Sequence, residues 1–162
     1  MPINHVIIDS SPLIVLFKSS QYELLPQLFT EIIVPSGVFE EVVLVKNVDA
    51  ASRELSNMPW IQRVETTSIS PEIAAWDLGK GESQVLSLAS EMEDVTAIVD
   101  DQAARRCGKT LGIATIGTGG LLVLAKRRGL IDSVNPRIQS LRDSGLWLSD
   151  TVVNFLKKQA GE

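Results

Sequence analysis

The chain has almost no sulfur or imidazole chemistry. Its 162 residues include one cysteine, Cys107, and one histidine, His5. A lone cysteine excludes an internal disulfide and suits a reducing compartment, so we expect a cytoplasmic protein. One cysteine and one histidine also exclude an ordinary zinc site, which uses about four nitrogen or sulfur ligands. The sequence therefore predicts neither a disulfide framework nor a structural zinc domain.

Long apolar runs are also missing. No stretch approaches the roughly 18 apolar residues of a membrane span. The N-terminal segment MPINHVIID (1–9) lacks the charged start and long apolar stretch of a signal peptide. Hydrophobic residues make up 44% and charged residues 22% of the chain, which is ordinary for a globular protein. We expect no membrane association and one domain over residues 1–162.

Positive charge is scarce in the first hundred residues. Residues 1–100 hold five Lys and Arg against fifteen Asp and Glu, whereas residues 101–162 hold ten against five. The overall pI near 4.9 argues against broad, non-specific affinity for nucleic acid. The asymmetry has two interpretations. It reflects either solvated helix faces or an acidic cluster facing a basic surface, as polyanion binding requires.

Short apolar strands alternate with helical segments along the whole chain. This alternation predicts an α/β fold, with three α/β/α layers and a short, mainly parallel, five-stranded sheet. In such sheets the functional crevice lies outside the carboxyl ends of the strands. The expected strands are 5–9, 31–35, 61–65, 96–100 and 112–116. Two expected helices follow glycine-containing stretches: LGKGES (78–83) leads into a helix that reaches about Glu91, and GTGG (117–120) opens a helix to Arg128. The other expected helices are 12–18, 21–29, 36–46, 49–57, 101–111, 134–143 and 149–159.

Carboxylates stand where the predicted strands end. Asp9 ends the first expected strand, Asp100 ends the fourth, and Asp101 begins the turn that follows it. One of these aspartates is explained as a helix N-cap, but two adjacent like charges exceed that need. Glu82 lies about 40° from the centre of an apolar helix face. A carboxylate inside such a stripe is costly unless it is paired, protonated or bound to a cation.

The adjacent pair in the helix after Ser36 can be separated by helical phase. Val38, Val42 and their apolar neighbours set the buried direction, from which Glu40 points about 160° away and Glu41 about 100° away. We therefore expect Glu40 to be solvated. Glu41 is the better candidate to reach the crevice.

Converging carboxylates need protons or a cation. Two carboxylates about 4 Å apart repel by roughly 4 kcal/mol at an effective dielectric constant near 20. Because a domain is stable by only about 5–15 kcal/mol, several such pairs would threaten the fold. All-oxygen ligation selects Mg²⁺ or Mn²⁺ over zinc. A metal held this way can activate water and bridge a phosphate, which is the chemistry of phosphodiester hydrolysis.

Five segments in order give the chain a family resemblance. It resembles the PIN domain, the metal-dependent nuclease fold shared by VapC-like toxins and RNA-processing nucleases, and it looks closest to a poorly characterised PIN-like subgroup. The resemblance covers nearly the whole chain. The segments are VIIDSSPLI (6–14), VPSGVFEEV (34–42), LGKGESQVLSLA (78–89), IVDDQAARR (98–106) and GIATIGTGGLLVLAKRRGLI (112–131).

The resemblance implies a catalytic acidic quartet that holds Mg²⁺ or Mn²⁺ and positions the attacking water. The quartet falls on Asp9, Glu41, Glu82 and Asp101. PIN domains usually have one aspartate at the last of these positions, so Asp100 is a second candidate ligand there. The implied activity is that of a metal-dependent endoribonuclease with RNA as substrate. An antitoxin protein and a second copy of the chain are candidate partners, because VapC-like toxins belong to the family.

Residues flanking the quartet are candidates for substrate binding. GTGG (117–120) follows a strand and opens a helix, so its backbone amides are candidates to meet a phosphate. Thr118 is expected either to add a hydroxyl near the metal, where many PIN domains carry a polar residue, or to cap the helix in a plain turn. Arg105 and Arg106 bind RNA phosphates or form a solvated helix face. Lys126–Arg128 are expected to be surface charges that compensate a helix dipole. The three tryptophans are scattered along the sequence and predict no base-stacking platform.

Other folds also place carboxylates at strand ends. A phosphoacceptor receiver needs paired acids at its first strand, where this chain has only Asp9. A haloacid-dehalogenase-type phosphatase needs Asp-x-Asp there, and Asp9-Ser10-Ser11 does not provide it. A binding or regulatory module that keeps the PIN fold without cleaving is the remaining alternative. The presence of all four expected carboxylates favours the enzyme.

Overall fold

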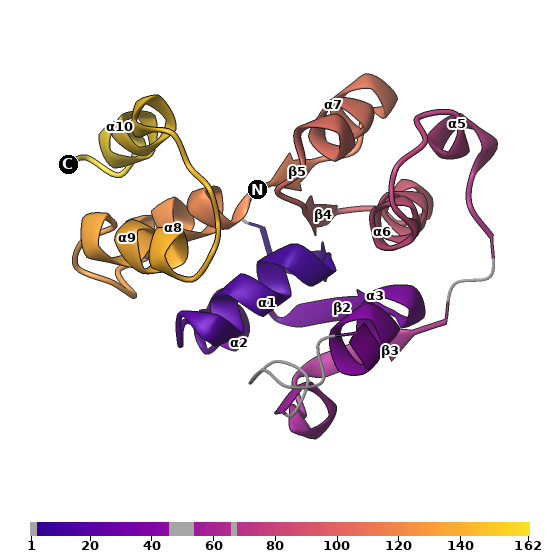
Figure 1. The fold of residues 1–162 in the computed structure, drawn as a ribbon, viewed down its shortest axis with the longest axis horizontal. Helices are drawn as coiled ribbons and strands as arrows, with labels where there is room; N and C mark the ends of the chain where they lie inside the picture. The colour runs from indigo at the N-terminus through magenta and orange to yellow at the C-terminus, as the bar shows by residue number, and fades with distance from the viewer. Residues whose placement is uncertain (1–2, 46–53, 66–67) are drawn as a thin grey trace.

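The computed structural model describes residues 3–45, 54–65 and 68–162, and shows a central sheet with helices on both faces (Figure 1). The sheet has five strands, all parallel, in the order β3-β2-β1-β4-β5. The expected three-layer α/β/α fold is confirmed. The strands are β1 His5–Ile8, β2 Glu31–Pro35, β3 Ile61–Val64, β4 Val95–Ile98 and β5 Thr115–Ile116.

Burial on both faces explains why the central strands are continuous apolar runs. Val6, Ile7 and Ile8 of β1 are fully buried, and all of β4 is buried. A strand covered by helices on both sides has no solvent face to fill with polar residues. Ile8 pairs with Ile98 in the parallel register. The residues that follow each strand therefore emerge side by side at the carboxyl edge.

The helices divide between the two faces. In Figure 1, α1, α2 and α8–α10 lie on one side of the sheet, and α3, α6 and α7 lie on the other. No helix in the described part of the chain has the length and apolar content that crossing a membrane requires. The helices are α1 Ser10–Lys18, α2 Leu24–Leu28, α3 Ser36–Glu40, α5 Pro71–Ala74, α6 Lys80–Glu91, α7 Gln102–Leu111, α8 Thr118–Arg127, α9 Asn135–Asp143 and α10 Asp150–Gln159.

Most expected elements agree with the structure to within a few residues, and the exceptions have local causes. The predicted helix 36–46 is α-helical only to Glu40, and Glu41–Val45 form a π-helical turn (η1). The last expected strand shortens to Thr115–Ile116 because Gly112 ends α7 in the left-handed region, with φ 75°. The expected helix 49–57 lies mostly outside the described residues, and a 3₁₀ turn (η2) occupies Leu55–Asn57.

The cations near the end of α8 bond to other parts of the fold. Arg128 donates to the carbonyls of Leu28 and Ile3, and Arg127 donates to the carbonyl of Gln159. Lys126 lies 3.0 Å from the Glu162 carboxylate. Lys126 and Arg127 lie in the last turn of α8, as expected for charges that compensate a helix dipole, but the three cations also have specific partners that were not predicted. These contacts leave no local pattern in the sequence, because the partners are distant along the chain and are mainly backbone carbonyls.

The Glu162 carboxylate is itself anchored. It accepts hydrogen bonds from Ser133 Oγ and Val134 N, both at 2.7 Å. These bonds, together with Lys126, lower the pKa of Glu162 to about 2. Helix α10 is therefore fixed against the α8–α9 connection, which sets the position of the chain beside the carboxyl edge of the sheet.

Candidate functional site

Asp9 occupies the centre of the carboxyl edge. It follows β1, its backbone N–H donates to Ile98 O at 3.1 Å, and it is 3% exposed. Its Oδ1 accepts the Ser10 N–H at 2.8 Å, which makes Asp9 the N-cap of α1. Burial raises the pKa of Asp9 to about 7. The Ser10 bond opposes this rise, and the negative charges of Glu82, Glu41 and Asp100 add to it.

Glu41 reaches the same edge from the point where α3 becomes a π-helical turn. Its Oε2 accepts the Ser10 hydroxyl at 2.7 Å, and the residue is half-buried. Glu40 is exposed, with its carboxylate 4.0 Å from Arg63. The structure thus places the pair as expected, but by another route. The phase argument assumed a regular helix, whereas the π-turn adds a residue to one turn, a feature frequent at functional sites.

Gly81 makes room for Asp9 and Glu41 to approach each other. A Cβ at this position would lie 2.9 Å from Glu41 Oε1 and 3.1 Å from Asp9 Oδ1, so any side chain would displace them. Gly81 is the second residue of α6, and glycine is a poorer helix former than alanine. Sequence reasoning missed this role. The signal was present, because an isolated glycine in a helical pattern usually has a packing or functional reason.

Helix α6 carries Glu82 and, two residues on, Gln84, which bonds α6 to α3. Glu82 lies in the first turn of α6, half-buried, and burial raises its pKa, with the charges of Asp101 and Glu41 adding to the effect. Gln84 Oε1 accepts the Gly37 N–H at 2.9 Å. This buried bond joins the helices that carry Glu41 and Glu82. Gln84 is a positioning residue that sequence reasoning also missed, because its partner is a backbone group far along the chain.

The doubled aspartate divides into two roles. Asp100 is half-buried, and its two oxygens accept Thr118 N at 2.7 Å and Thr118 Oγ1 at 2.6 Å. Burial raises the pKa of Asp100 in spite of these bonds and of the nearby Arg105. Asp101 is exposed and caps α7, accepting Ala104 N at 2.9 Å. Both aspartates belong to the site, Asp100 acting electrostatically on Asp9 and Asp101 on Glu82.

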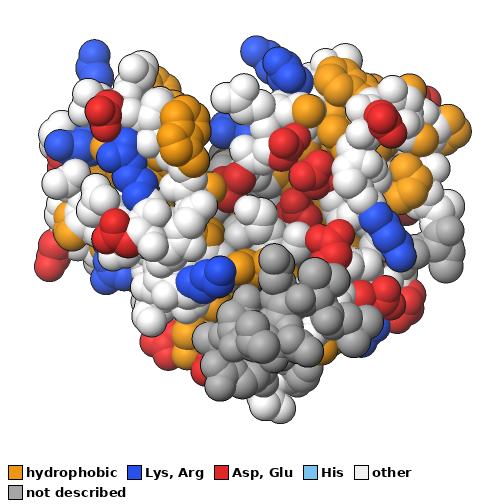
Figure 2. Space-filling model, in the orientation of Figure 1, with side chains coloured by type: hydrophobic (Ala, Val, Ile, Leu, Met, Phe, Trp, Pro, Cys, Tyr) orange, Lys and Arg blue, Asp and Glu red, His pale blue; other side chains and the backbone are white. Residues whose placement is uncertain are grey.

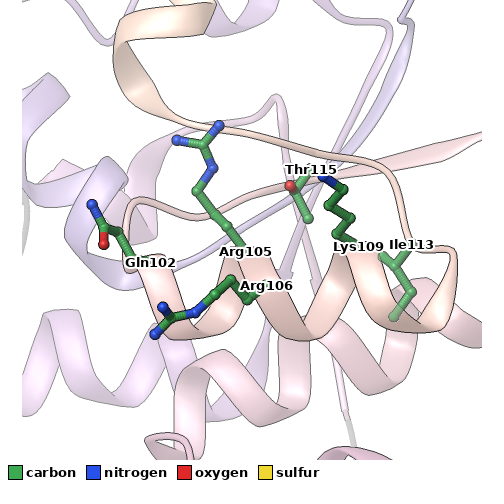
Figure 3. A pocket seen from close by; sticks show the side chains of 6 residues that line it. All are labelled: Gln102, Arg105, Arg106, Lys109, Ile113 and Thr115. Carbon is green, nitrogen blue, oxygen red and sulfur yellow. The ribbon is translucent and has the colours of Figure 1, made fainter. Parts of the chain in front are cut away.

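The predicted substrate-binding residues lie on different sides of this edge. Thr118 is fully buried, and both of its hydrogen bonds go to Asp100, so it positions that carboxylate and has no surface for substrate. Arg105 and Arg106 leave α7 with Lys109 and line a cavity of about 430 Å³ (Figure 3). Arg105 Nη1 also lies 3.3 Å from where a Cβ on Gly117 would stand, close to Asp100.

The donor chemistry suits a hard divalent cation. Acidic side chains gather at the centre of one face, in a hollow between the α8–α10 side and the α7 side (Figure 2). Within residues 3–45, 54–65 and 68–162, no three His, Cys, Asp or Glu side chains are already arranged to hold a metal ion. The available donors are carboxylate oxygens, the ligands of Mg²⁺ and Mn²⁺. A buried carboxyl with a pKa near neutrality would be ionised by such a cation.

Comparison with known families assigns the fold. The sequence matches the family model DUF3368, a PIN domain, over residues 5–162. The chain belongs to the PIN domain family. PIN domains have a nuclease-type fold, and PIN domain nucleases generally use divalent metals. The family resemblance inferred from the sequence is therefore confirmed.

Solved structures include similar folds. Twelve chains match, among them a PilT N-terminus domain protein from the hyperthermophilic archaeon Sulfolobus solfataricus P2. That match has 15% sequence identity and a TM-score of 0.47, and it covers 72% of this chain and 89% of the other. No protein of curated function matches the sequence.

The raised pKa of Asp9 predicts a pH-dependent stability. The native state holds a proton on Asp9 up to about pH 7, whereas the unfolded chain loses it near pH 3.8. Stability of the metal-free protein should therefore fall as pH rises through this window, by about 1.4 kcal/mol between pH 6 and pH 8. Urea unfolding in EDTA at the two pH values measures this change. Asp9→Asn should flatten the profile, and an equally steep profile in the variant would refute the assignment.

Proposed function

We propose that this PIN domain is a Mg²⁺- or Mn²⁺-dependent endoribonuclease that hydrolyses phosphodiester bonds in RNA. The observation that supports it most directly is the convergence of the Asp9 and Glu41 carboxylates over Gly81. Glu82 and Asp100 stand at the same edge of the sheet and act electrostatically on Asp9, and Asp101 acts on Glu82. Such a concentration of negative charge around the buried Asp9 is costly unless a cation or protons neutralise it.

The carboxylates would act as metal ligands, and neighbouring hydrogen-bond donors orient two of them. Asp9, Glu41, Glu82 and Asp101 would hold the cation, with Asp100 the alternative to Asp101. A bound divalent cation supplies a water of lowered pKa and neutralises charge on the phosphate. The Ser10 hydroxyl orients Glu41, and Thr118 orients Asp100. Asp101 caps α7 through its Oδ2 atom, which leaves its Oδ1 atom to act as a ligand.

The biological setting we propose is that of a cytoplasmic toxin paired with an antitoxin protein. Fold-level analogy within the PIN domain family supports this setting. A small gene for a DNA-binding protein next to the gene for this chain would support the pairing. Co-purification of the two products would test the pairing directly. Sedimentation of this chain alone would show whether it forms a homodimer.

A non-catalytic nucleic-acid-binding or regulatory PIN module is the second candidate. The observation in its favour is that Arg105, Arg106 and Lys109 form a basic face that could bind phosphates without help from the carboxylates. The two candidates differ in one property. Only the nuclease requires the carboxylates for its effect on RNA.

Substituting the adjacent glutamates tests the nuclease proposal. Glu41→Gln removes a charge that faces Asp9, and should lower Mn²⁺-dependent cleavage of labelled RNA by about a hundredfold or more, since even outer-shell losses cost 10–100-fold. Glu40→Gln is the matched control, because Glu40 is exposed. It should cleave at the wild-type rate. EDTA should abolish cleavage in both.

Three outcomes would count against the proposal. Equal loss in the two glutamate variants would mean that their different placement is irrelevant to activity. Unchanged cleavage by Asp9→Asn would assign the activity to a contaminant or another site. Intact Mn²⁺ binding without cleavage of any RNA would move the assignment to the non-catalytic module.

Gly81 provides a steric test that leaves every carboxylate in place. Gly81→Ala should preserve the fold, because alanine favours a helix interior, but its methyl group would occupy the space that Glu41 and Asp9 share. We expect at least a roughly tenfold loss of Mn²⁺ affinity, measured from the electron paramagnetic resonance signal of free Mn²⁺. Gly120→Ala in α8 is the control, since its Cβ would meet only Ile116 at 3.7 Å. Wild-type affinity in both variants would contradict the geometry.

A further inference from the structure

A groove begins at the acidic edge and runs along the C-terminal helices. Its volume is about 830 Å³, and Asp100, Asp101 and Arg105 line one end of it. Trp147 and Phe155 line its other side, 82% and 58% exposed. Figure 2 shows the corresponding notch beside the α8–α10 side of the molecule. Large aromatic side chains with this exposure on a small domain indicate a contact surface.

Hydrogen bonds and close helix packing fix the position of the loop that carries Trp147. Arg142 donates to Leu148 O and lies 3.0 Å from the Asp150 carboxylate, so it fixes the connection between α9 and α10. Gly119 lets α10 approach α8 closely, since a Cβ there would stand 2.6 Å from Leu156 Cδ1. Trp147 is thus an exposed ring on a loop that is bonded in place.

The groove is continuous with the basic face of α7. Arg105 lines both the groove and the cavity formed with Arg106 and Lys109 (Figure 3). Within the part of the chain that the structure describes, these three cations form no ion pair within 4.0 Å. An aromatic wall beside a run of free cations is the combination that binds single-stranded nucleic acid, through stacked bases and neutralised phosphates.

We infer that this groove binds a nucleobase adjacent to the scissile phosphate of single-stranded RNA, with the base stacked on Trp147 or Phe155 and phosphates on Arg105 and Arg106. The inference rests on the proposed ribonuclease function. A base paired in a duplex has both faces stacked and cannot enter, so the groove selects unpaired RNA. The sequence predicted no platform because the tryptophans are scattered. The structure supplies the second ring from Phe155 instead.

Binding without metal tests the groove separately from cleavage. The probe is a short fluorescein-labelled single-stranded RNA, titrated with the protein in EDTA and followed by fluorescence anisotropy. Trp147→Leu keeps apolar area but removes the ring, and should weaken binding about tenfold. Trp147→Phe keeps a ring and should bind within about twofold of wild type. Leu130→Ala removes an exposed apolar side chain elsewhere and should have no effect.

An abasic version of the same strand identifies what the ring contacts. Wild type should bind it about tenfold less tightly than the intact strand, and Trp147→Leu should bind both alike. Equal loss on both strands, or no loss from Trp147→Leu, would overturn the inference. So would a change in sedimentation from dimer to monomer with RNA affinity unchanged, which would make the groove a protein contact.

Cleavage of the unlabelled strand with Mn²⁺ separates this inference from the function it rests on. Base-dependent binding without cleavage overturns the nuclease proposal and leaves the groove assignment supported. If the RNA is cleaved but its binding does not depend on Trp147, the nuclease proposal is supported and the groove assignment is overturned.

Discussion

Electrostatic repulsion among carboxylates at the carboxyl edge of the sheet is the constraint on which this site depends. The parallel register places Asp9 beside the chain that leaves β4, so Asp9 and Asp100 are neighbours by topology. Donors from Ser10 and Thr118 offset part of the repulsion. They do not remove it: burial raises the pKa of Asp9 to about 7, and the charges of Glu82, Glu41 and Asp100 still add to that rise. The proposed cation would neutralise this repulsion.

Two glycines allow the close contacts on which the carboxylate cluster and the groove depend. Gly81 leaves space in which Asp9 and Glu41 meet, and Gly119 leaves space in which α10 packs against α8. Gly81 therefore lets the carboxylates come together, and Gly119 lets α10 pack where its Phe155 lines the groove. Both glycines sit in helices, where glycine is unfavourable, so close approach accounts for their presence. The same feature, a glycine at a point of close contact, thus occurs at both the carboxylate cluster and the groove.

Sequence patterns predicted the five-stranded sheet, the mainly parallel direction of its strands and the carboxylates at strand ends, because buried strands and strand-end crevices leave local signals. They separated Glu41 from Glu40, although by assuming a helix that the structure interrupts with a π-turn. Contacts between distant segments were not accessible. Gln84 with Gly37, and Thr118 with Asp100, pair residues whose sequence neighbourhoods say nothing of each other. Phe155 was missed for the same reason, since only the packing of α10 brings it to the groove.

Thermal melting with and without Mn²⁺, on wild type and Glu82→Gln, tests the convergence of the carboxylates most directly and needs no RNA. A cation that binds only the folded protein adds about 2.7 kcal/mol at a hundredfold excess over Kd. For a domain of this size that is roughly 5–10 °C in Tm. Wild type should show this rise. Glu82→Gln should melt higher than wild type in EDTA, because repulsion is relieved, and gain less from Mn²⁺. No rise in wild type at millimolar Mn²⁺ would show that these carboxylates form no metal site.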